Sequence, residues 1–168
     1  SDLHAGMLAI ISDNEKGQRR ELTWPDLRRQ VAALARHLQA QGVRPGDRVA
    51  AYLPNVPETM VAFLAVVSVG AIWSVCAPDM GTNAVLDRFK QITPKVLIAC
   101  DGVTYGGKDH DRSGVVSELR AALPTVQHLV YWNNLGNGHL PNCADFAKVV
   151  AAGGEDPGFA DRKSTRLN

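Results

Sequence analysis

One stretch of the chain combines glycines, a lysine and a preceding apolar run in a spacing that could bind phosphate. Residues 102–108 (Gly-Val-Thr-Tyr-Gly-Gly-Lys) match the G-x-x-x-x-G-K pattern of a nucleotide phosphate loop and follow the apolar run 96–100. Two features oppose this interpretation. Asp109 stands where a Mg²⁺-binding hydroxyl is needed, and the next predicted helix begins near Ser113 instead of at the lysine. A surface turn with glycines at positive φ is the commoner alternative.

A histidine between two acids follows the same stretch. His110 lies between Asp109 and Asp111, which could indicate a metal site or an acid–base pair. Adjacent side chains point in different directions on most backbones, so we expect a solvated segment instead. No Ser/His/Asp nucleophile signature occurs in the sequence.

The cysteines and the overall charge exclude several other classes. Cys76, Cys100 and Cys143 are odd in number and lack Cys-x-x-Cys spacing, which predicts reduced thiols in a cytoplasmic protein and neither a metal site nor disulfides. The net charge of +1 provides no electrostatic argument for binding nucleic acid or an anionic membrane. No apolar run approaches the roughly 20 residues that span a bilayer, and the first residues lack the pattern of a secretory signal.

Strands and helices are predicted to alternate along the chain. After an opening hairpin (7–12 and 20–23), we expect strands at 48–53, 71–77, 96–100 and 128–132, and helices from 23, 57, 82, 113 and 144. We expect Thr23 and Thr82 to be the amino-terminal cap residues of the first and the third of these helices. This pattern predicts an α/β fold with a mostly parallel sheet and helices on both faces. The helix at 57–69 is apolar almost all round, so we expect it to be buried. Ligands of such sheets bind beyond the carboxyl ends of the strands, where residues 102–108 lie.

The pattern of elements ends near residue 154. Residues 1–154 hold all the expected helices and strands, whereas residues 155–168 show neither an apolar period nor strand character. We interpret 155–168 as a disordered tail, with a non-native origin as one explanation.

Over about residues 8–150 the chain resembles the adenylate-forming acyl-CoA ligases, also called AMP-binding enzymes. The motifs that carry the resemblance are residues 22–27 (Leu-Thr-Trp-Pro-Asp-Leu), 42–55 (Gly-Val-Arg-Pro-Gly-Asp-Arg-Val-Ala-Ala-Tyr-Leu-Pro-Asn), 70–74 (Gly-Ala-Ile-Trp-Ser) and 74–79 (Ser-Val-Cys-Ala-Pro-Asp). Residues 78–79, 86–89 and 105–110 are similar to the branch of the family that activates acetoacetate.

The resemblance implies a reaction and a coenzyme site. Such enzymes activate a carboxylate with ATP, for which Mg²⁺ is expected, to an acyl-adenylate with release of pyrophosphate, and then transfer the acyl group to the thiol of CoA. The implied CoA-binding residues are Thr104, Tyr105, Gly106, Gly107 and Lys108, with Lys108 on a CoA phosphate and Tyr105 near the adenine. Related acetate-activating ligases carry arginines in this loop, which are absent here.

Other motifs of the family do not occur in this sequence. The Ser/Thr/Gly-rich phosphate loop ending in lysine, the later adenine and ribose motifs and the carboxyl-terminal domain with its adenylation lysine are missing. We therefore expect a partial amino-terminal domain of a longer ligase, inactive by itself, with no catalytic residue and no metal ligand assigned. Its exposed apolar surface would be covered by the remainder of the ligase chain. The alternatives are a flavodoxin-like nucleotide-binding module, a phosphate-loop nucleotidase and a ligase for another short acid such as acetate.

Overall fold

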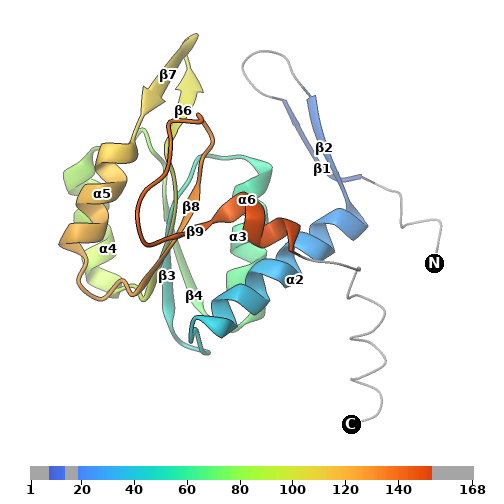
Figure 1. Ribbon diagram of the computed structural model, residues 1–168, viewed down its shortest axis with the longest axis horizontal. Coiled ribbons are helices and arrows are strands. Elements are labelled where there is room, and N and C mark those ends of the chain that lie inside the picture. Colours follow the sequence, from blue (N-terminus) through green and yellow to red (C-terminus); the bar gives the residue numbers. More distant parts are fainter. Residues whose placement is uncertain (1–7, 14–18, 153–168) are drawn as a thin grey trace.

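A five-stranded sheet with helices on both faces forms the body of the computed structural model, which describes residues 8–13 and 19–152 (Figure 1). The strands are β1 (Leu8–Asp13), β2 (Arg19–Thr23), β3 (Arg48–Tyr52), β4 (Ile72–Cys76), β5 (Val96–Cys100), β6 (Gly102–Tyr105), β7 (Lys108–Asp111), β8 (His128–Trp132) and β9 (Ala144–Asp145). The helices are α2 (Trp24–Ala40), α3 (Pro57–Ser68), α4 (Thr82–Ile92), α5 (Ser113–Ala122) and α6 (Phe146–Ala151).

The main sheet has the strand order β4-β3-β5-β8-β9, and every pair of neighbours in it is parallel. Helices α2, α3 and α6 cover one face of the sheet, and α4 and α5 cover the other (Figure 1). Two antiparallel hairpins, β1–β2 and β6–β7, lie outside the main sheet. The predicted α/β architecture is confirmed.

The core is divided between the two faces by the alternation of side chains along each strand. In β5 every residue is fully buried; Ile98 packs in the cluster with α2, α3 and α6, and Leu97 packs in the cluster with α4 and α5. Because both faces of this strand are covered, its sequence is a continuous apolar run instead of an alternating one.

The first described helix begins where its sequence predicts. The Thr23 side chain accepts a hydrogen bond from the Asp26 backbone N–H at 3.3 Å, which caps the amino terminus of α2. Leu34 and Leu38 of α2 are fully buried on one face. The preceding hairpin is tied to α3 by a bidentate ion pair between the Arg20 guanidinium and the Glu58 carboxylate, at 2.7 and 2.6 Å.

Helix α3 differs from its prediction. Val61, Ala62, Ala65 and Val66 are fully buried, but Met60, Phe63 and Val67 keep 45%, 37% and 43% of their surface exposed. The expectation of a fully buried helix is wrong because apolar composition does not say how many neighbours a helix has. Helix α3 packs on α2 and on β4, and these described neighbours cover Met60, Phe63 and Val67 only in part.

Two element boundaries also differ from the sequence-based expectation. The last helix is preceded by the short strand β9, which extends the sheet beyond β8, so α6 begins at Phe146 instead of near residue 144. Gly81, and not Thr82, is the amino-terminal cap residue of α4. The predicted hairpin turn and the predicted tail at 155–168 lie outside the described residues.

Candidate functional site

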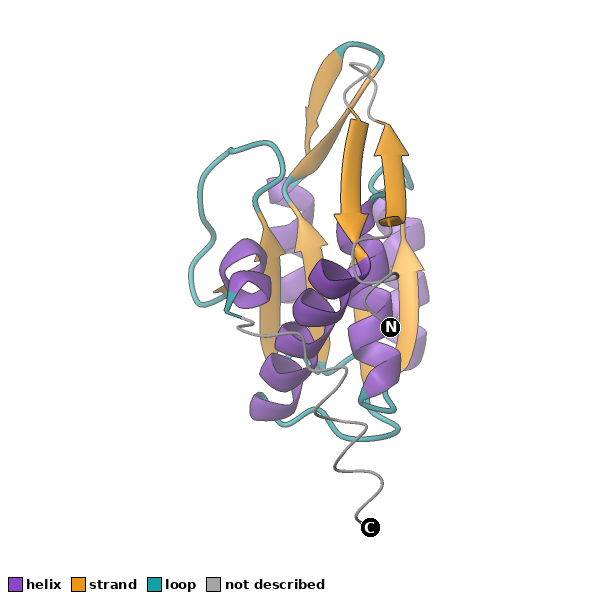
Figure 2. Cartoon of the chain, turned by 90° about the vertical axis from the view of Figure 1, so that its right-hand side faces the viewer, coloured by secondary structure: helices purple, strands orange, loops and turns teal. Residues whose placement is uncertain are grey.

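The loops that follow β3, β4, β5 and β8 gather at the carboxyl edge of the parallel sheet. The hairpin β6–β7 directly follows β5 and projects beyond this edge (Figure 2). The sequence therefore placed residues 104–108 correctly at the edge where ligands of such sheets bind.

Residues 104–108 form a β-hairpin and not the expected loop. Gly106 and Gly107 have φ of 59° and 73°, the two consecutive positive values that a two-residue hairpin turn needs, and Tyr105 pairs with Lys108 across it. The phosphate-loop interpretation is wrong for the same reason. The lysine begins a strand, and the next helix starts only at Ser113, so no helix amino terminus faces the turn.

The side chains of the hairpin contact one another across its two strands. The Thr104 hydroxyl donates to the Asp109 carboxylate at 2.6 Å. The rings of Tyr105 and His110 stack with centroids 3.7 Å apart and planes at 7°, and His110 Nε2 lies 3.2 Å from the Tyr105 carbonyl oxygen. Asp111 accepts from the backbone N–H and the hydroxyl of Ser113 at the start of α5, and these bonds lower its pKa.

The acidic residues and the histidine of β7 therefore each have a different partner. Asp109 contacts Thr104, His110 contacts Tyr105, and Asp111 contacts Ser113, as the adjacent-residue argument predicted. Across the described part of the chain, no three His, Cys, Asp or Glu side chains group as metal ligands would.

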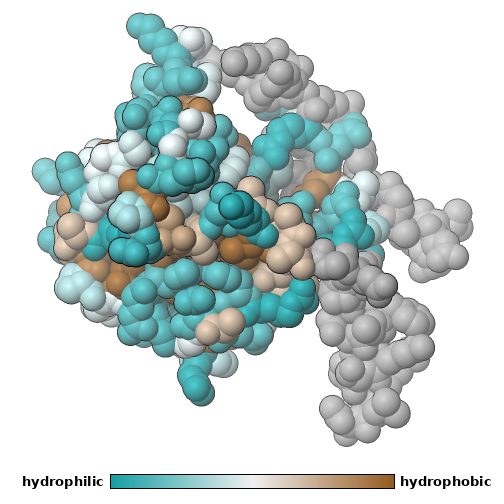
Figure 3. Space-filling view, viewed as in Figure 1, coloured by the Kyte–Doolittle hydropathy of each residue, from teal (hydrophilic) through white to brown (hydrophobic). Residues whose placement is uncertain are grey.

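The tip of the hairpin presents a cation to solvent. Lys108 is exposed, and among the described residues it makes no ion pair. Tyr105 keeps 47% of its surface exposed although His110 covers one face of its ring. In the space-filling view the hairpin is a mostly hydrophilic projection at the top of the molecule (Figure 3). This arrangement can offer one positive charge and one aromatic ring to an anionic, ring-bearing ligand.

Asp101, at the base of the hairpin, is a residue that sequence reasoning missed. It is fully buried, and its carboxylate accepts hydrogen bonds from the backbone N–H of Leu135 at 2.9 and 3.1 Å and of Asn137 at 3.2 Å. Its own carbonyl oxygen accepts from the Arg112 N–H at 2.6 Å. Asp101 thus connects the start of β6, the end of β7 and the loop after β8. In the sequence, Asp101 could have been recognised as an acidic residue that directly follows an all-apolar predicted strand.

Gly102 permits this close packing. Its φ is +151°, and a Cβ at this position would lie 2.1 Å from the His110 carbonyl oxygen and 2.6 Å from Leu135 Cδ1. No residue with a side chain fits there without moving the hairpin or the loop that begins at residue 133.

A second connection joins the loop after β4 to the hairpin. The Pro78 carbonyl oxygen accepts from the Tyr52 hydroxyl at 3.2 Å and from Arg112 Nε at 2.9 Å. Burial raises the pKa of Tyr52 to about 12, so this phenol stays a neutral donor at neutral pH. These contacts place the 77–81 loop against the start of α5.

The cysteines are all free and offer no nucleophile. Cys76 and Cys100 are buried, and burial raises the pKa of Cys100 to about 12, so its thiol stays protonated at neutral pH. None of the described helices combines the length and the apolar character needed to cross a membrane.

Comparison with known proteins gives consistent matches. The family model described as "AMP-binding enzyme" matches residues 3–153. The acetoacetyl-coenzyme A synthetase of Rhizobium meliloti is 50% identical over 120 residues, 70% of this chain and 18% of the relative. A malonamoyl-CoA synthetase of Penicillium aethiopicum is 38% identical over 123 residues, 73% of this chain and 17% of the relative.

A solved structure agrees with the sequence matches. The acetoacetyl-CoA synthetase from Streptomyces lividans superposes with a TM-score of 0.89 at 45% identity, over 92% of this chain and 24% of that chain. The chain therefore spans about a fifth of the length of the relatives it matches.

Proposed function

Because this chain belongs to the family of AMP-binding enzymes, we propose that it forms the amino-terminal part of an acetoacetate–CoA ligase. In the proposed reaction, the acetoacetate carboxylate attacks the α-phosphorus of ATP, forming acetoacetyl-adenylate and releasing pyrophosphate. The CoA thiol then attacks the acyl carbon, AMP leaves, and acetoacetyl-CoA is formed. The observation that carries the proposal is the 50% and 45% identity to two enzymes named for this product.

ATP, CoA and acetoacetate are the proposed substrates, and Mg²⁺ is expected with ATP. Since no three candidate metal ligands group together in the described ranges 8–13 and 19–152, we derive no step through a metal ion. We place the enzyme in the cytoplasm, which its free cysteines support.

The proposed CoA-binding residues are Thr104, Tyr105, Gly106, Gly107 and Lys108. Lys108 would hold a phosphate of CoA, and Tyr105 would pack near the adenine with the ring face that His110 leaves open. The support is the projection of the hairpin, the exposed lysine without an ion pair in the described residues, and the narrow turn that Gly106 and Gly107 permit. The Thr104–Asp109 hydrogen bond would keep the strands paired when CoA binds.

The test of the reaction uses the complete reading frame that contains this sequence. We expect it to continue into a Ser/Thr/Gly-rich loop that ends in lysine, and its product to form acetoacetyl-CoA, AMP and pyrophosphate from acetoacetate, ATP and CoA. A stop codon directly after Asn168, or a folded product without this activity, would contradict the proposal.

A ligase for another short acid is the second candidate. The identity of 38% to a malonamoyl-CoA synthetase favours it, because a relative this similar is named for a different acid. The ratio of kcat/KM for acetoacetate to kcat/KM for acetate and malonamate decides between them. A ratio below one would transfer the proposal to the other acid while leaving the reaction class unchanged.

The coenzyme site is tested by Lys108→Ala in the complete enzyme. Loss of one charge-assisted hydrogen bond, about 1.5 kcal/mol, should raise the KM for CoA about tenfold and leave the KM for ATP unchanged. Lys108→Arg should keep most of the affinity, and Lys90→Ala, an exposed lysine in the last turn of α4, is the matched control. An unchanged KM for CoA in Lys108→Ala would remove Lys108 from the site.

A further inference from the structure

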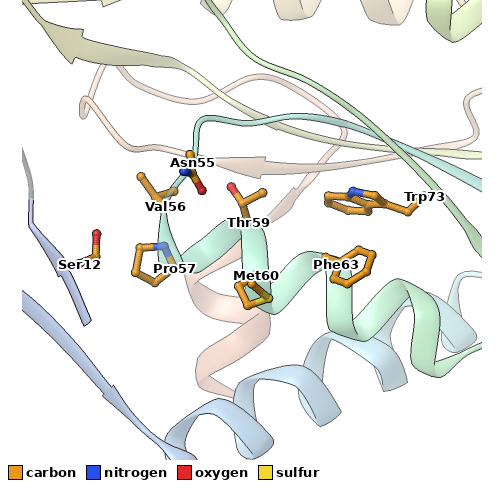
Figure 4. Close-up of a pocket in the computed structure, with 8 residues that line it drawn as sticks. All are labelled: Ser12, Asn55, Val56, Pro57, Thr59, Met60, Phe63 and Trp73. Carbon is orange, nitrogen blue, oxygen red and sulfur yellow. The ribbon is translucent and has the colours of Figure 1, made fainter. Parts of the chain in front are cut away.

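Two hollows of the chain differ in their linings. The groove beside α3 is lined mainly by apolar side chains, among them Met60, Phe63 and Trp73 (Figure 4). Phe63 packs edge-on against Trp73 with ring centroids 5.7 Å apart, and the Thr59 hydroxyl in this groove already donates to the Pro54 carbonyl oxygen. This groove therefore offers little polar chemistry by which a ligand could be recognised.

The second hollow is a polar pocket at the edge of the sheet farthest from β4. Its walls are the end of β8, the start of α6 and the loop 133–143, which arches out from the sheet between β8 and β9 (Figure 1). The polar residues that line it are Tyr131, Asn133, His139, Cys143, Asp145 and Lys148. Its volume of about 430 Å³ lies in the range of small-molecule sites. We call it the β8 pocket.

Two polar groups of the β8 pocket have no hydrogen-bond partner among the described residues. Tyr131 keeps only 4% of its surface exposed, and its hydroxyl is unpaired there. Asn133 Oδ1 is buried and also lacks a donor. Buried polar groups in proteins are normally paired, so these two groups, which line the same pocket, mark a place for a polar ligand.

This part of the pocket favours a neutral group over an anion. Burial, and then the negative charges of Asp101 and Asp111, raise the pKa of the Tyr131 phenol, which stays neutral at neutral pH. The same two carboxylates repel an anion placed beside Tyr131. A primary amide meets these conditions, because it is uncharged, its N–H can donate to Asn133 Oδ1, and its carbonyl oxygen can accept from the Tyr131 hydroxyl.

Lys148 provides a positive charge in the lining of the same pocket. Its side chain is exposed and makes no ion pair among the described residues. Asp145, the acidic residue of the lining, already accepts from the backbone N–H of Ala147 at 2.9 Å and of Lys148 at 3.3 Å, as the cap of α6. The anionic end of a ligand is therefore attracted to Lys148 and repelled by Asp145.

The loop that encloses the pocket is fixed by contacts with other elements. The Arg120 guanidinium of α5 donates to the carbonyl oxygens of Pro141 and Asn142. The buried Asp101 carboxylate holds the other end of the loop through the backbone bonds described above. The pocket is thus formed before a ligand binds, which lowers the entropic cost of binding.

We propose that the β8 pocket binds a short carboxylate whose other end is a primary amide, with the amide between Tyr131 and Asn133 and the carboxylate at Lys148. The pocket shares no residue with the proposed CoA-binding hairpin. The inference does not rest on the proposed function, because every residue that it uses lies in the described part of this chain.

Succinamate and levulinate test the proposal. They have the same shape and charge, and differ only in ending with an amide nitrogen or with a methyl group. Each is titrated into the 168-residue chain while the backbone amide shifts are followed by NMR. For so small a ligand we expect succinamate to bind with a Kd of about 1–10 mM and to shift the amides of residues 133–148. Levulinate should bind at least fivefold more weakly.

Single variants assign each contact. Asn133→Ala should remove the preference for succinamate over levulinate, because the methyl group of levulinate never used that acceptor. Tyr131→Phe, which keeps the ring, and Lys148→Ala should each weaken both ligands at least threefold. Lys90→Ala, an exposed lysine of α4, is the matched control and should change neither.

Equal binding of the two ligands, or no saturable shift at residues 133–148, would overturn the proposal. A preference for succinamate that survives in Asn133→Ala would also overturn it. A loss of binding in Lys90→Ala as large as in Lys148→Ala would show only general attraction between carboxylates and lysines, and the proposal would fail.

If the 168-residue chain does not fold, hydrogen exchange in the complete enzyme replaces the titration. Succinamate should slow exchange in peptides that cover residues 133–148, levulinate should not, and Asn133→Ala should abolish the difference; unchanged exchange would overturn the proposal. A complete enzyme without ligase activity would contradict the proposed function but not this pocket. An active enzyme without the exchange effect would contradict the pocket alone.

Discussion

Asp101 is the residue on which the geometry of the carboxyl edge depends most. Two backbone N–H groups from the loop after β8 donate to its carboxylate, and it is the one fully buried charged side chain among the described residues. Removing its carboxylate leaves those two N–H groups without their acceptor in a partly buried loop. Its contribution is therefore structural, and it acts on the hairpin and on the loop after β8 together.

Asp101→Ala should lower the free energy of unfolding by about 1–3 kcal/mol, because two partly buried backbone donors lose their buried acceptor. Asp101→Asn should cost less, since the amide oxygen can still accept. Urea denaturation measures the change, and hydrogen exchange should show faster exchange at the Leu135 and Asn137 amides. Glu118→Ala, which removes an exposed carboxylate on the outer face of α5, is the control and should stay within about 0.5 kcal/mol. Equal losses of stability in Asp101→Ala and Glu118→Ala would contradict this role.

At the scale of elements, the hairpin β6–β7 contains glycines that are required for two different structural reasons. Gly106 and Gly107 need only a left-handed backbone, with open space around them, whereas Gly102 has backbone and side-chain atoms within 3 Å of a hypothetical Cβ. The first reason is conformational, and the second is steric. The sequence contains glycines for both, but only the packed structure distinguishes them.

Gly102→Ala should therefore be more damaging than Gly106→Ala. We expect Gly106→Ala to cost about 1 kcal/mol for the left-handed backbone, and Gly102→Ala to cost clearly more and to expose the β6–β7 amides to hydrogen exchange. Gly114→Ala, inside α5 with open space around it, should instead stabilise by about 0.5–1 kcal/mol. Denaturation of the three variants measures the order, and a smaller loss for Gly102→Ala than for Gly106→Ala would contradict the steric explanation.

At the scale of the whole molecule, a histidine pair joins the α2 layer to the sheet. His37 Nε2 of α2 lies 2.8 Å from His128 Nε2 at the start of β8, so one ring must donate and the other accept. Burial lowers the pKa of both histidines, and the proximity of His37 and Arg120 lowers the pKa of His128 further. The folded chain therefore favours the neutral rings.

Stability should fall as the pH drops below about 6.5. Because the unfolded histidines titrate near 6.5 and the folded ones lower, the unfolded chain takes up protons first, and the stability present above pH 6.5 is lost as the pH falls through the folded values. Melting temperatures between pH 5 and 8 measure this. His37→Gln should reduce the slope of melting temperature against pH, and His139→Gln, at an exposed position, should leave that slope unchanged. If the melting temperature depends on pH equally in His37→Gln and in the unchanged protein, the histidine pair is not the source of the pH dependence.

Much of this fold could be predicted from the chain because local patterns determine it. The continuous apolar run of β5, the Thr23 cap and the alternation of strand and helix are properties of neighbouring residues, and each occurs in the structure as expected. The position of residues 104–108 at the carboxyl edge follows from the same alternation. The sequence alone also contained the motifs that placed the chain in its family.

Only the tertiary structure decided which groups meet. The burial of Asp101 depends on a loop more than thirty residues further along the chain. The exposure of Met60, Phe63 and Val67 depends on how much of α3 its described neighbours α2 and β4 cover. A periodic pattern specifies which residues share a face of a helix, but packing between distant segments decides whether that face is covered. For this reason the sequence could identify the elements and the family, while the anchoring of the hairpin and the open apolar face required the folded chain.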